Sequence, residues 1–418
     1  MGNTPNIRFK GFTNDWEQCK LGDISEIKTG PFGSTLHADD YVSDGIPIIT
    51  TEHFKTGTLP IKKDGLPQVS ENDFNRLSAY ILNEGDIVFS RVGSVDINAL
   101  ITPFQNNWLF SGRVLRVRPQ GENSSQFLHT LLETESVRSD IRTRAVGQTM
   151  PSINTEILKI TPLFLPTSIA EQERLGEYFH NLDHLITLHQ RKCDETKELK
   201  KFMLQKMFPK NGEKKPEIRF EGFTDDWEQR KLIDYLEVSH LKNKTEVYGK
   251  EDVLSVSGDF GIVNQIEFQG RSFAGASVSN YGVVETGDIV YTKSPLKANP
   301  YGIIKTNKGK TGIVSTLYAV YKPKENTDSK FVQIYFEQDA RMNNYMQPLV
   351  NKGAKNDMKV SDENALKGVV SFPQKAEQIA ISGYFDKLDT LITLQQRKCD
   401  EIKVIKKFML QNMFPQKG

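Results

Sequence analysis

Four short segments of the chain carry residue types that take part in catalysis or metal binding. Gly309-Lys310-Thr311 has the residue order that ends a phosphate-binding loop, and Asn299-Pro300-Tyr301 matches part of the base-binding motif of amino-group methyltransferases. Glu26-Ile27-Lys28 has residue types found at the metal-binding end of some nucleases. His180 and His184 have the i, i+4 spacing of a metal-binding pair on a helix.

Each of these segments lacks a part that its chemistry requires. A phosphate-binding loop needs a glycine five residues before Gly309, where this chain has Ile304. The methyltransferase-like segment lacks the second proline and a convincing glycine-rich cofactor loop upstream, and three residues are too few to indicate a nuclease. The glutamate of the HExxH zinc motif is replaced by Asn181. We therefore predict no catalytic, cofactor or metal site on this chain.

The chain contains a duplicated frame around two dissimilar inserts. The opening blocks, residues 6–21 and 217–232, are identical at 12 of 16 aligned positions. The closing blocks, residues 178–209 and 384–415, are identical at 24 of 32. A repeat of this length predicts two large units, and the unequal inserts suggest a paired reader.

Each closing block lies in a long stretch with the pattern of an amphipathic helix. Residues 169–208 and about 376–414 carry apolar side chains mostly three or four positions apart, with charged residues between them. At 1.5 Å per residue, a helix of roughly 40 residues is about 60 Å long. A helix of this length with one apolar stripe needs a partner helix, and we expect that partner to be its own duplicate.

Two further features concern how the copies are joined. Polar residues interrupt the apolar stripes at His189 and Gln395; they either fix the register of the helix pair or tolerate partial exposure, and both readings stay open. Residues 209–216 form a polar, turn-rich linker between the copies. Because the C-terminal residues resemble the start of this linker and the N-terminal residues resemble its end, we expect the termini to lie close together.

Both inserts contain short β-branched and aromatic runs between turns, which predict strands. The predicted strands include residues 46–50, 86–89, 114–117, 288–291 and 318–321, and short helices are expected at 125–143 and 329–346. The sequence Gly-Asp-Ile-Val occurs in both inserts, so they should share a fold. The predicted fold class is α+β, with two similar domains in a pseudo-twofold arrangement, joined by two long helices that form an antiparallel coiled coil.

The composition is that of a globular protein, with 37% hydrophobic and 26% charged residues. A formal net charge of +1 neither indicates nor excludes nucleic acid, because phosphate binding depends on a local basic face. If DNA is the partner, this near-neutral charge suggests that other subunits supply much of the positive charge.

The sequence shows no targeting or membrane signal. No charged-then-apolar segment opens the chain, and no run approaches the roughly 18 apolar residues of a membrane helix. We therefore expect a cytoplasmic protein with no membrane partner. The cysteines Cys19, Cys193 and Cys399 form no CxxC pair, and the last two are expected to be small core residues of the long helices.

The whole chain resembles the DNA-specificity subunit of type I restriction–modification enzymes. The resemblance rests on the duplicated frame, on Trp16 and Trp227 in the opening blocks, on the Gly-Asp-Ile-Val strands, and on the Glu-Gln pairs that begin both long helices. The loop 28–34, Lys-Thr-Gly-Pro-Phe-Gly-Ser, looks like the glycine-rich loop frequent in first target-recognition domains of that family. Each motif alone is weak, whereas their arrangement over nearly all 418 residues is specific.

The resemblance implies a non-catalytic, sequence-specific DNA-binding subunit. In that family each insert is a target-recognition domain that reads one half of a split, asymmetric site in double-stranded DNA, and the helices separate the domains like a ruler. Two modification (methyltransferase) subunits dock on this scaffold, and restriction (motor-nuclease) subunits join them in the full complex. S-adenosylmethionine, ATP and Mg²⁺ are then used by other subunits, with no cofactor on this chain.

The resemblance also implies a division of the chain into five segments. They are target-recognition domain 1 with its opening block (1–168), the first spacer helix (169–208), the linker (209–216), target-recognition domain 2 (217–375) and the second spacer helix (376–414). Trp16 and Trp227 belong to the common frame, so we expect them to serve packing or the docking of modification subunits.

Candidate DNA-contacting residues are basic or hydrogen-bonding side chains in predicted loops, because arginine pairs with guanine, Gln or Asn pairs with adenine, and lysine more often holds phosphate. In the first insert the candidates are Lys28, Ser34, Arg91, Arg113, Arg142, Arg144, Gln148 and Thr149. In the second they are Lys293, Lys297, Lys352, Lys355 and Asn356. For any one of them, a plain solvated side chain is the alternative. Gly30 either lets the backbone approach DNA or makes a turn, and Phe32 either inserts into DNA or packs under its loop.

Two other classes of function stay open on the sequence. One is a self-sufficient DNA methyltransferase or nuclease, and activity of the chain alone with S-adenosylmethionine and Mg²⁺ would reveal it. The other is a coiled-coil assembly scaffold with two protein-binding domains, which partner binding without any salt-dependent DNA affinity would favour.

Overall fold

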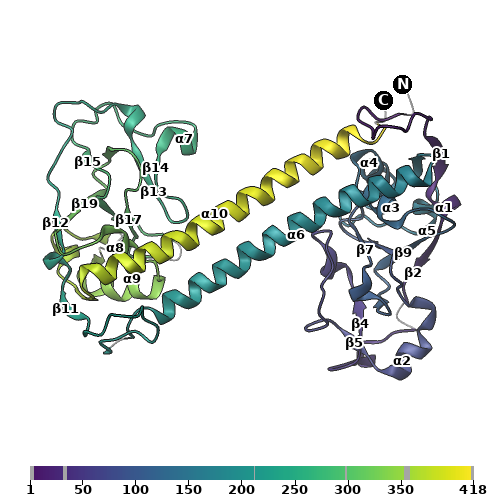
Figure 1. The fold of residues 1–418 in the computed structure, drawn as a ribbon, viewed down its shortest axis with the longest axis horizontal. Helices are drawn as coiled ribbons and strands as arrows, with labels where there is room; N and C mark the ends of the chain where they lie inside the picture. Colours follow the sequence, from purple (N-terminus) through teal and green to yellow (C-terminus); the bar gives the residue numbers. More distant parts are fainter. Residues whose placement is uncertain (1–3, 32–34, 211, 297–298, 353–357, 416–418) are drawn as a thin grey trace. The chain divides into compact units, whose positions relative to one another are not determined.

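The structure is a computed structural model that describes residues 4–31, 35–210, 212–296, 299–352 and 358–415. The chain divides into two compact units: unit 1 comprises Met1–Gln190 and Gln396–Gly418, and unit 2 comprises Arg191–Gln395 (Figure 1). Each unit therefore holds one insert with its opening block, and a part of each long helix.

The two predicted long helices are confirmed. Helix α6 spans Ile169–Lys206 and helix α10 spans Lys375–Asn412, each of 38 residues. Both end shortly before the proline of their closing block, where a helix cannot easily continue. No helix in the described parts of the chain is long and apolar enough to cross a membrane.

Segments of the two helices pack against each other inside unit 1. Lys406 Nζ lies 2.7 Å from a carboxylate oxygen of Asp183, and Cys399 Sγ donates a weak hydrogen bond to the carbonyl oxygen of Ile186 at 3.8 Å. Residue numbers fall along one helix as they rise along the other, so the predicted antiparallel pairing is confirmed in this unit.

Unit 2 contains the matching contacts. Lys200 Nζ lies 2.7 Å from Asp389, and Cys193 Sγ donates to the carbonyl oxygen of Ile392 at 3.8 Å. Cys193 and its duplicate Cys399 are both fully buried, which confirms the expectation of small core residues where the two helices approach closely.

Each insert is built on a four-stranded antiparallel sheet. In unit 1 the strand order is β2-β9-β6-β7, and in unit 2 it is β12-β19-β16-β17. The strands of unit 1 are β2 (Ser25–Thr29), β9 (Val114–Pro119), β6 (Ile87–Ser90) and β7 (Asn98–Leu100). Those of unit 2 are β12 (Leu236–Val238), β19 (Tyr318–Pro323), β16 (Ile289–Thr292) and β17 (Ile304–Thr306). The equal order confirms that the inserts share a core fold.

The repeated Gly-Asp-Ile-Val sequence has a local physical explanation. Gly85 and Gly287 have φ of +87° and +93°, a conformation that favours glycine. The next residues, Asp86 and Asp288, are buried, and each accepts a hydrogen bond of 2.8 Å from the backbone N–H three residues before it. The pair thus makes the tight turn that leads into β6 and β16.

In the chain, two short helices follow β9 in unit 1 and β19 in unit 2, as the sequence predicts. They are α3 (Ser125–Leu132) and α4 (Glu135–Arg144) in unit 1, and α8 (Ser329–Tyr335) and α9 (Asp339–Met346) in unit 2. The side chains of Ser124 and Asp328 cap α3 and α8 by accepting the N–H of the third helical residue.

The Glu-Gln pairs that begin the long helices tie those helices to the inserts. Gln172 accepts the backbone N–H of Ser124 at 3.3 Å, and the buried carboxylate of Glu171 accepts from Arg8 at 2.6 Å. In unit 2, Gln378 and Glu377 make the same contacts with Asp328 and Arg219.

In each unit, the opening block of one copy contacts the closing block of the other copy. The N–H of Ile7 donates to the carbonyl oxygen of Asn412 at 2.8 Å, which confirms that the N-terminal and C-terminal segments lie together. In unit 2, the N–H of Ile218 donates to Lys206 at 2.9 Å, at the equivalent positions. Short antiparallel strand pairs complete each frame: β1 (Glu17–Lys20) with β10 (Pro162–Leu165), and β11 (Glu228–Lys231) with β22 (Val369–Phe372).

The inserts differ in the elements around their sheets. Unit 1 adds β3 (Tyr41–Val42), β5 (Gln68–Val69), β4 (Ile46–Ile49) and β8 (Leu109–Phe110) as a second sheet, with α1 (Leu21–Ile24), α2 (Glu71–Arg76) and α5 (Thr155–Lys159). Unit 2 adds the two-stranded pairs β13 (Leu254–Ser257) with β14 (Gly261–Asn264), β15 (Gly282–Val284) with β18 (Gly312–Val314), and β20 (Asn351–Lys352) with β21 (Met358–Lys359), and helix α7 (Gln265–Gln269). The two inserts therefore differ in structure in the elements outside the shared four-stranded sheet.

Candidate nucleic-acid interface

Several candidates gather at one edge of the central sheet of unit 1. Strands β2 and β6 end at this edge and β9 begins there, because β9 runs antiparallel to both. Gly30 directly follows β2, Arg91 follows β6, and Arg113 precedes β9. We call these strand ends, with the loop residues 91–94 and 111–113, the strand-end edge of unit 1.

The two arginines of this edge have different environments. The backbone N–H of Arg91 donates to the carbonyl oxygen of Arg113 at 3.0 Å, and the Arg91 guanidinium donates to the carbonyl oxygen of Gly112 at 3.2 Å. The side chain of Arg91 is half-buried, whereas Arg113 is exposed. Arg113 is therefore the guanidinium of this edge that is most open to a ligand.

A hairpin continues the strand-end edge. Val146 and Ser152 exchange two backbone hydrogen bonds of 2.9 Å, and the N–H of Gly93 donates to the carbonyl oxygen of Pro151 at 2.8 Å. These bonds fix the hairpin beside the loop that follows Arg91. Its exposed tip carries the candidates Gln148 and Thr149.

Gly30 and Lys28 have structural explanations in this unit. A Cβ on Gly30 would lie 2.1 Å from the carbonyl oxygen of Ser111, so a larger residue would push the two loops apart. Lys28 lies in β2 and not in a loop, because it pairs with Arg116 in the sheet, and its ammonium lies 5.0 Å from the ring centre of Tyr80.

The prediction that Arg142 and Arg144 lie in a loop is wrong. Both are in the last turn of α4, where arginine favours the negative end of the helix dipole. Arg142 forms ion pairs with Asp96 at 2.6 Å and with Glu135, and Arg144 pairs with Asp140 at 2.7 Å. The hydrogen bonds that the guanidinium groups donate to Asp96 and to Asp140 raise the pKa of Arg142 and Arg144, respectively. A DNA contact by either would have to compete with these pairs.

Unit 2 has an edge of the same construction with different side chains. Lys293 follows β16, and its N–H donates to the carbonyl oxygen of Leu317, which precedes β19, at 3.2 Å. The Lys293 ammonium forms an ion pair with Asp362 at 2.5 Å. Lys293 and Leu317, with the residues that adjoin them, form the strand-end edge of unit 2.

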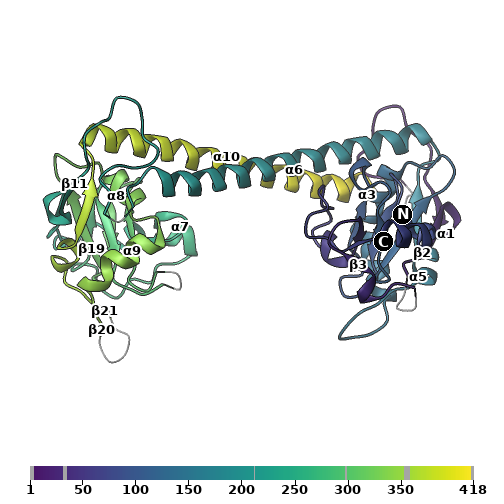
Figure 2. The same ribbon diagram turned by 90° about the horizontal axis from the view of Figure 1, so that it is seen from below.

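The remaining candidates are placed only in part. Lys352 lies in β20, and Figure 2 shows the β20–β21 hairpin on the side of unit 2 away from the long helices. Phe32, Ser34, Lys297, Lys355 and Asn356 lie outside the described residues.

Leu317 is not among the candidates predicted from sequence, which in the second insert are all basic or hydrogen-bonding side chains. Its signal was positional: it directly precedes a predicted strand, as Arg113 does in the other insert. In the structure, 63% of its surface is exposed.

The segments that resemble catalytic motifs are accounted for by other structure. The loop with Gly309 leads into strand β18, whereas a phosphate-binding loop leads into a helix. The side-chain amide of Asn299 donates to Asp339 at 2.8 Å. His180 and His184 are exposed on α6, and within the described ranges no group of three or more His, Cys, Asp or Glu could hold a metal ion.

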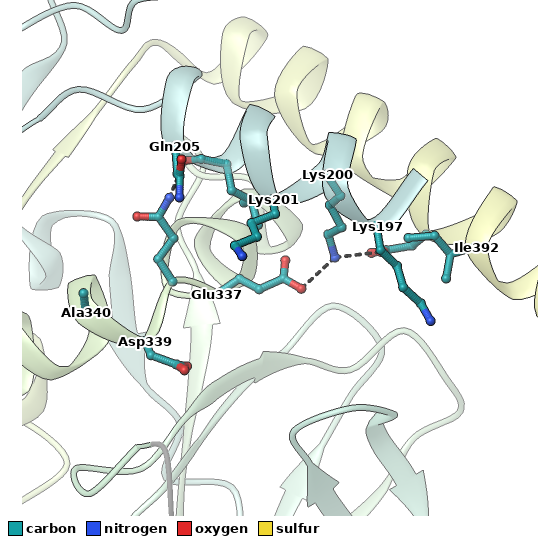
Figure 3. A pocket seen from close by; sticks show the side chains of 11 residues that line it. Lys197, Lys200, Lys201, Gln205, Glu337, Asp339, Ala340 and Ile392 are labelled. Atoms are coloured by element: carbon teal, nitrogen blue, oxygen red, sulfur yellow. Dashed lines mark hydrogen bonds and ion pairs between the residues drawn. The ribbon is translucent and has the colours of Figure 1, made fainter. Parts of the chain in front are cut away.

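A pocket beside α6 in unit 2 is lined by ion-paired side chains. Figure 3 shows the ammonium of Lys200 directed at Glu337. Lys200 Nζ lies 2.6 Å from Glu337 and 2.7 Å from Asp389 of α10. Burial alone would lower the pKa of Lys200, but the charge of Glu337 and the hydrogen bonds to both carboxylates outweigh it and raise the pKa. This cluster joins the two long helices to the turn between α8 and α9, and we assign it to structure.

Comparison with known proteins gives consistent matches. The sequence family described as "Type I restriction modification DNA specificity domain" matches residues 13–198. The chain is 24% identical to the putative type I restriction enzyme MjaX specificity subunit of Methanocaldococcus jannaschii, over 94% of this chain and 91% of that protein. It is 22% identical to the type I restriction enzyme MjaVIII specificity subunit of the same organism, over 45% of this chain and 44% of that protein.

A solved structure shares the fold. The crystal structure of the S subunit of a type I restriction–modification system from M. genitalium superposes with a TM-score of 0.66 at 13% sequence identity, covering 99% of this chain and all of that one. At this identity the comparison establishes the α+β fold with its long helices.

Proposed function

We propose that this chain, a specificity subunit of the type I restriction–modification family, reads a bipartite and asymmetric sequence in double-stranded DNA. Specificity subunits are the non-catalytic recognition components of these systems. One observation carries the proposal. Each insert has its own sheet with the same strand order, but the strand-end edge carries Arg91 and Arg113 in unit 1 and Lys293 and Leu317 in unit 2. Two domains with the same backbone fold but different side chains at the strand-end edge can recognise two different half-sites.

Each insert reads one half-site in this proposal. The readers are the target-recognition domains within residues 1–168 and 217–375. Their base contacts come from the strand-end edges and, in unit 1, also from the hairpin 146–152 beside that edge. The lysines and the exposed arginines also hold phosphates, which position the protein without specifying sequence.

The long helices set the distance between the half-sites. A helix of 38 residues is about 57 Å long at 1.5 Å per residue, and two half-sites on one face of DNA lie about 34 Å apart. The antiparallel pairing of α6 and α10 stiffens this spacer, so the length of the unread gap follows from the helices.

The duplicated helix surface docks two copies of one partner, the modification subunit. Phe202 and its duplicate Phe408 are 47% and 54% exposed, next to the duplicated pair Leu199 and Ile405, which are also exposed. Exposed apolar residues at matching positions of both copies are typical of two equivalent interfaces. Restriction subunits join in the full complex, and the other subunits bring S-adenosylmethionine, ATP and Mg²⁺.

The test is DNA binding by the complex of this chain with modification subunits, using a DNA site mutated one base pair at a time. We expect two short essential patches that differ in sequence, separated by a gap that tolerates any base. A single continuous site, or binding that does not depend on the modification subunits, would contradict the proposal. Methylation or cleavage by the chain alone would show instead a self-sufficient enzyme.

A further inference from the structure

Arg113 and Leu317 occupy the same position in the two units. Strands β9 and β19 begin directly after them, and both strands lie second in their sheets. The carbonyl oxygen of Arg113 accepts the N–H of Arg91 at 3.0 Å, and that of Leu317 accepts the N–H of Lys293 at 3.2 Å. The backbone therefore presents the two side chains at equivalent points of the two strand-end edges.

The neighbouring side chain is engaged within the protein in each unit. Arg91 donates to the carbonyl oxygen of Gly112, and Lys293 is ion-paired with Asp362. Arg113 and Leu317 are both exposed, Leu317 at 63%. At each edge, the residue before the strand is thus more open to a ligand than the residue it bonds.

Exposure of a single leucine is common on protein surfaces and needs no explanation by itself. The informative observation is its position, because the equivalent point of unit 1 carries a guanidinium. An exposed guanidinium and an exposed isobutyl group at one structural position can distinguish different base pairs. In the major groove, arginine pairs bidentately with O6 and N7 of guanine, and an apolar side chain contacts the C5 methyl of thymine.

We propose that Arg113 and Leu317 are paired specificity residues of the two readers. Arg113 recognises a guanine in the half-site of unit 1, and Leu317 recognises a thymine methyl at the matching place in the half-site of unit 2. This inference rests on the proposed function and adds to it one base pair in each half-site.

An exchange experiment tests the proposal. The wild-type chain, Arg113→Leu, Leu317→Arg and the double variant are each expressed with the modification subunits, and the methylated sequences of each strain are determined. We expect Arg113→Leu to shift one position of one half-site from G·C towards T·A by roughly tenfold or more, and Leu317→Arg to shift one position of the other half-site in the opposite direction. The double variant should combine the two shifts, because each unit reads its half-site independently.

Two further variants keep the result interpretable. Arg113→Gln retains a polar side chain of similar reach and should move the same position towards adenine, which glutamine pairs with bidentately. Arg230→Leu removes an exposed guanidinium from β11, outside both strand-end edges, and should leave the methylated sequence unchanged. Thermal melting of each purified chain checks that it is folded.

The possible failures are distinct. An interrupted wild-type motif that every variant also retains would overturn the pairing while the proposed function stands. Uniform loss of methylation at all sites in folded Arg113→Leu and Arg113→Gln would assign Arg113 to a phosphate and would also overturn it. A wild-type strain without an interrupted motif would refute the proposed function itself.

Discussion

Trp16 and Phe414, which come from opposite ends of the chain, pack edge to face with their ring centres 5.8 Å apart and their planes at 90°. Trp227 and Phe208 repeat this contact in unit 2 at 5.9 Å and 83°. The opening block of each copy is therefore completed by the closing block of the other copy. Both tryptophans are buried, so of the two roles expected for them, packing is the one the structure supports.

Replacing these phenylalanines should destabilise one unit at a time. Phe414 is fully buried among Trp16, Phe127 and Phe179, so Phe414→Ala should cost about 3–5 kcal/mol of stability in unit 1. Hydrogen exchange measured by mass spectrometry should show faster opening of β2, β6 and β9 with little change in unit 2. Phe408→Ala, at a half-exposed site near the end of α10 and six residues before Phe414, is the control and should cost less than about 1 kcal/mol. Equal loosening of both units by Phe414→Ala would contradict this interpretation.

Lys406 should contribute stability that depends on pH. Its side chain is 12% exposed, and its ammonium lies 2.6 Å from Glu133 and 2.7 Å from Asp183. Lys406→Met removes the cation that both carboxylates share, although Glu133 keeps Arg138 at 3.8 Å, and should cost about 3 kcal/mol. Lys403→Met is the matched control, because Lys403 is exposed and only 4.0 Å from Asp400, and it should cost less than about 1 kcal/mol.

The pH dependence of the stability that Lys406 contributes follows from the direction in which its pKa is shifted. Burial alone would lower the pKa of Lys406, but the two carboxylates outweigh it and raise the pKa above its ordinary 10.5. A raised lysine pKa stabilises the fold fully below the unfolded value and ceases to do so as pH rises through the folded value. The difference in urea-unfolding free energy between wild type and Lys406→Met should therefore be constant from pH 7 to 9 and shrink above about pH 10.5. A difference that grows with alkaline pH would refute this account.

A circularly permuted chain should fold. The N–H of Ile7 bonds Asn412 as that of Ile218 bonds Lys206. A copy of the linker 209–216 should therefore join residue 414 to residue 6 without strain. A chain opened within the natural linker should then melt within a few degrees of the wild type. A chain opened between residues 191 and 206, inside α6, is the control and should be much less stable. Failure of the linker permutant to fold would contradict the closeness of Ile7 and Asn412 on which this prediction rests.

Lengthening both helices should change the gap in the DNA site and nothing else. Seven residues inserted after Gln190 in α6 and seven after Gln395 in α10 keep the contacts within each unit and add about 10 Å to each helix. With modification subunits present, the methylated motif should keep both half-sites and gain at most about three base pairs of gap. An unchanged gap would show that the helices do not set the spacing.

The frame was predictable from sequence because its physical signals are local. A period of three to four residues over 38 positions defines α6 and α10, and Gly85-Asp86 makes a turn from two adjacent residues. That the two end segments of the chain lie close together could also be inferred, because the C-terminal residues resemble the start of the linker 209–216 and the N-terminal residues resemble its end. Each of these features depends on neighbours in sequence or on an equivalent segment.

The candidate interface was predictable only in part, because it is assembled from distant segments. Gly30, Arg91 and Arg113 meet only once β9 pairs with both β2 and β6. A polar residue in a sequence does not reveal whether acidic side chains will pair with it, as they do with Arg142, or whether it will stay open at a sheet edge, as Arg113 does. Leu317 was not predicted because its side chain neither is basic nor forms hydrogen bonds; its position directly before β19 becomes informative only when it is compared with Arg113 in the structure.

The central claim is that one chain specifies two different half-sites through two inserts. Sequencing the methylated DNA of cells that express this chain with its modification subunits tests that claim most directly. We predict one motif made of two different short sequences separated by a gap of fixed length, and we predict that replacing residues 22–168 with a foreign insert of the same kind changes only one of the two. A continuous motif, or a change in both half-sites after that replacement, would contradict the account.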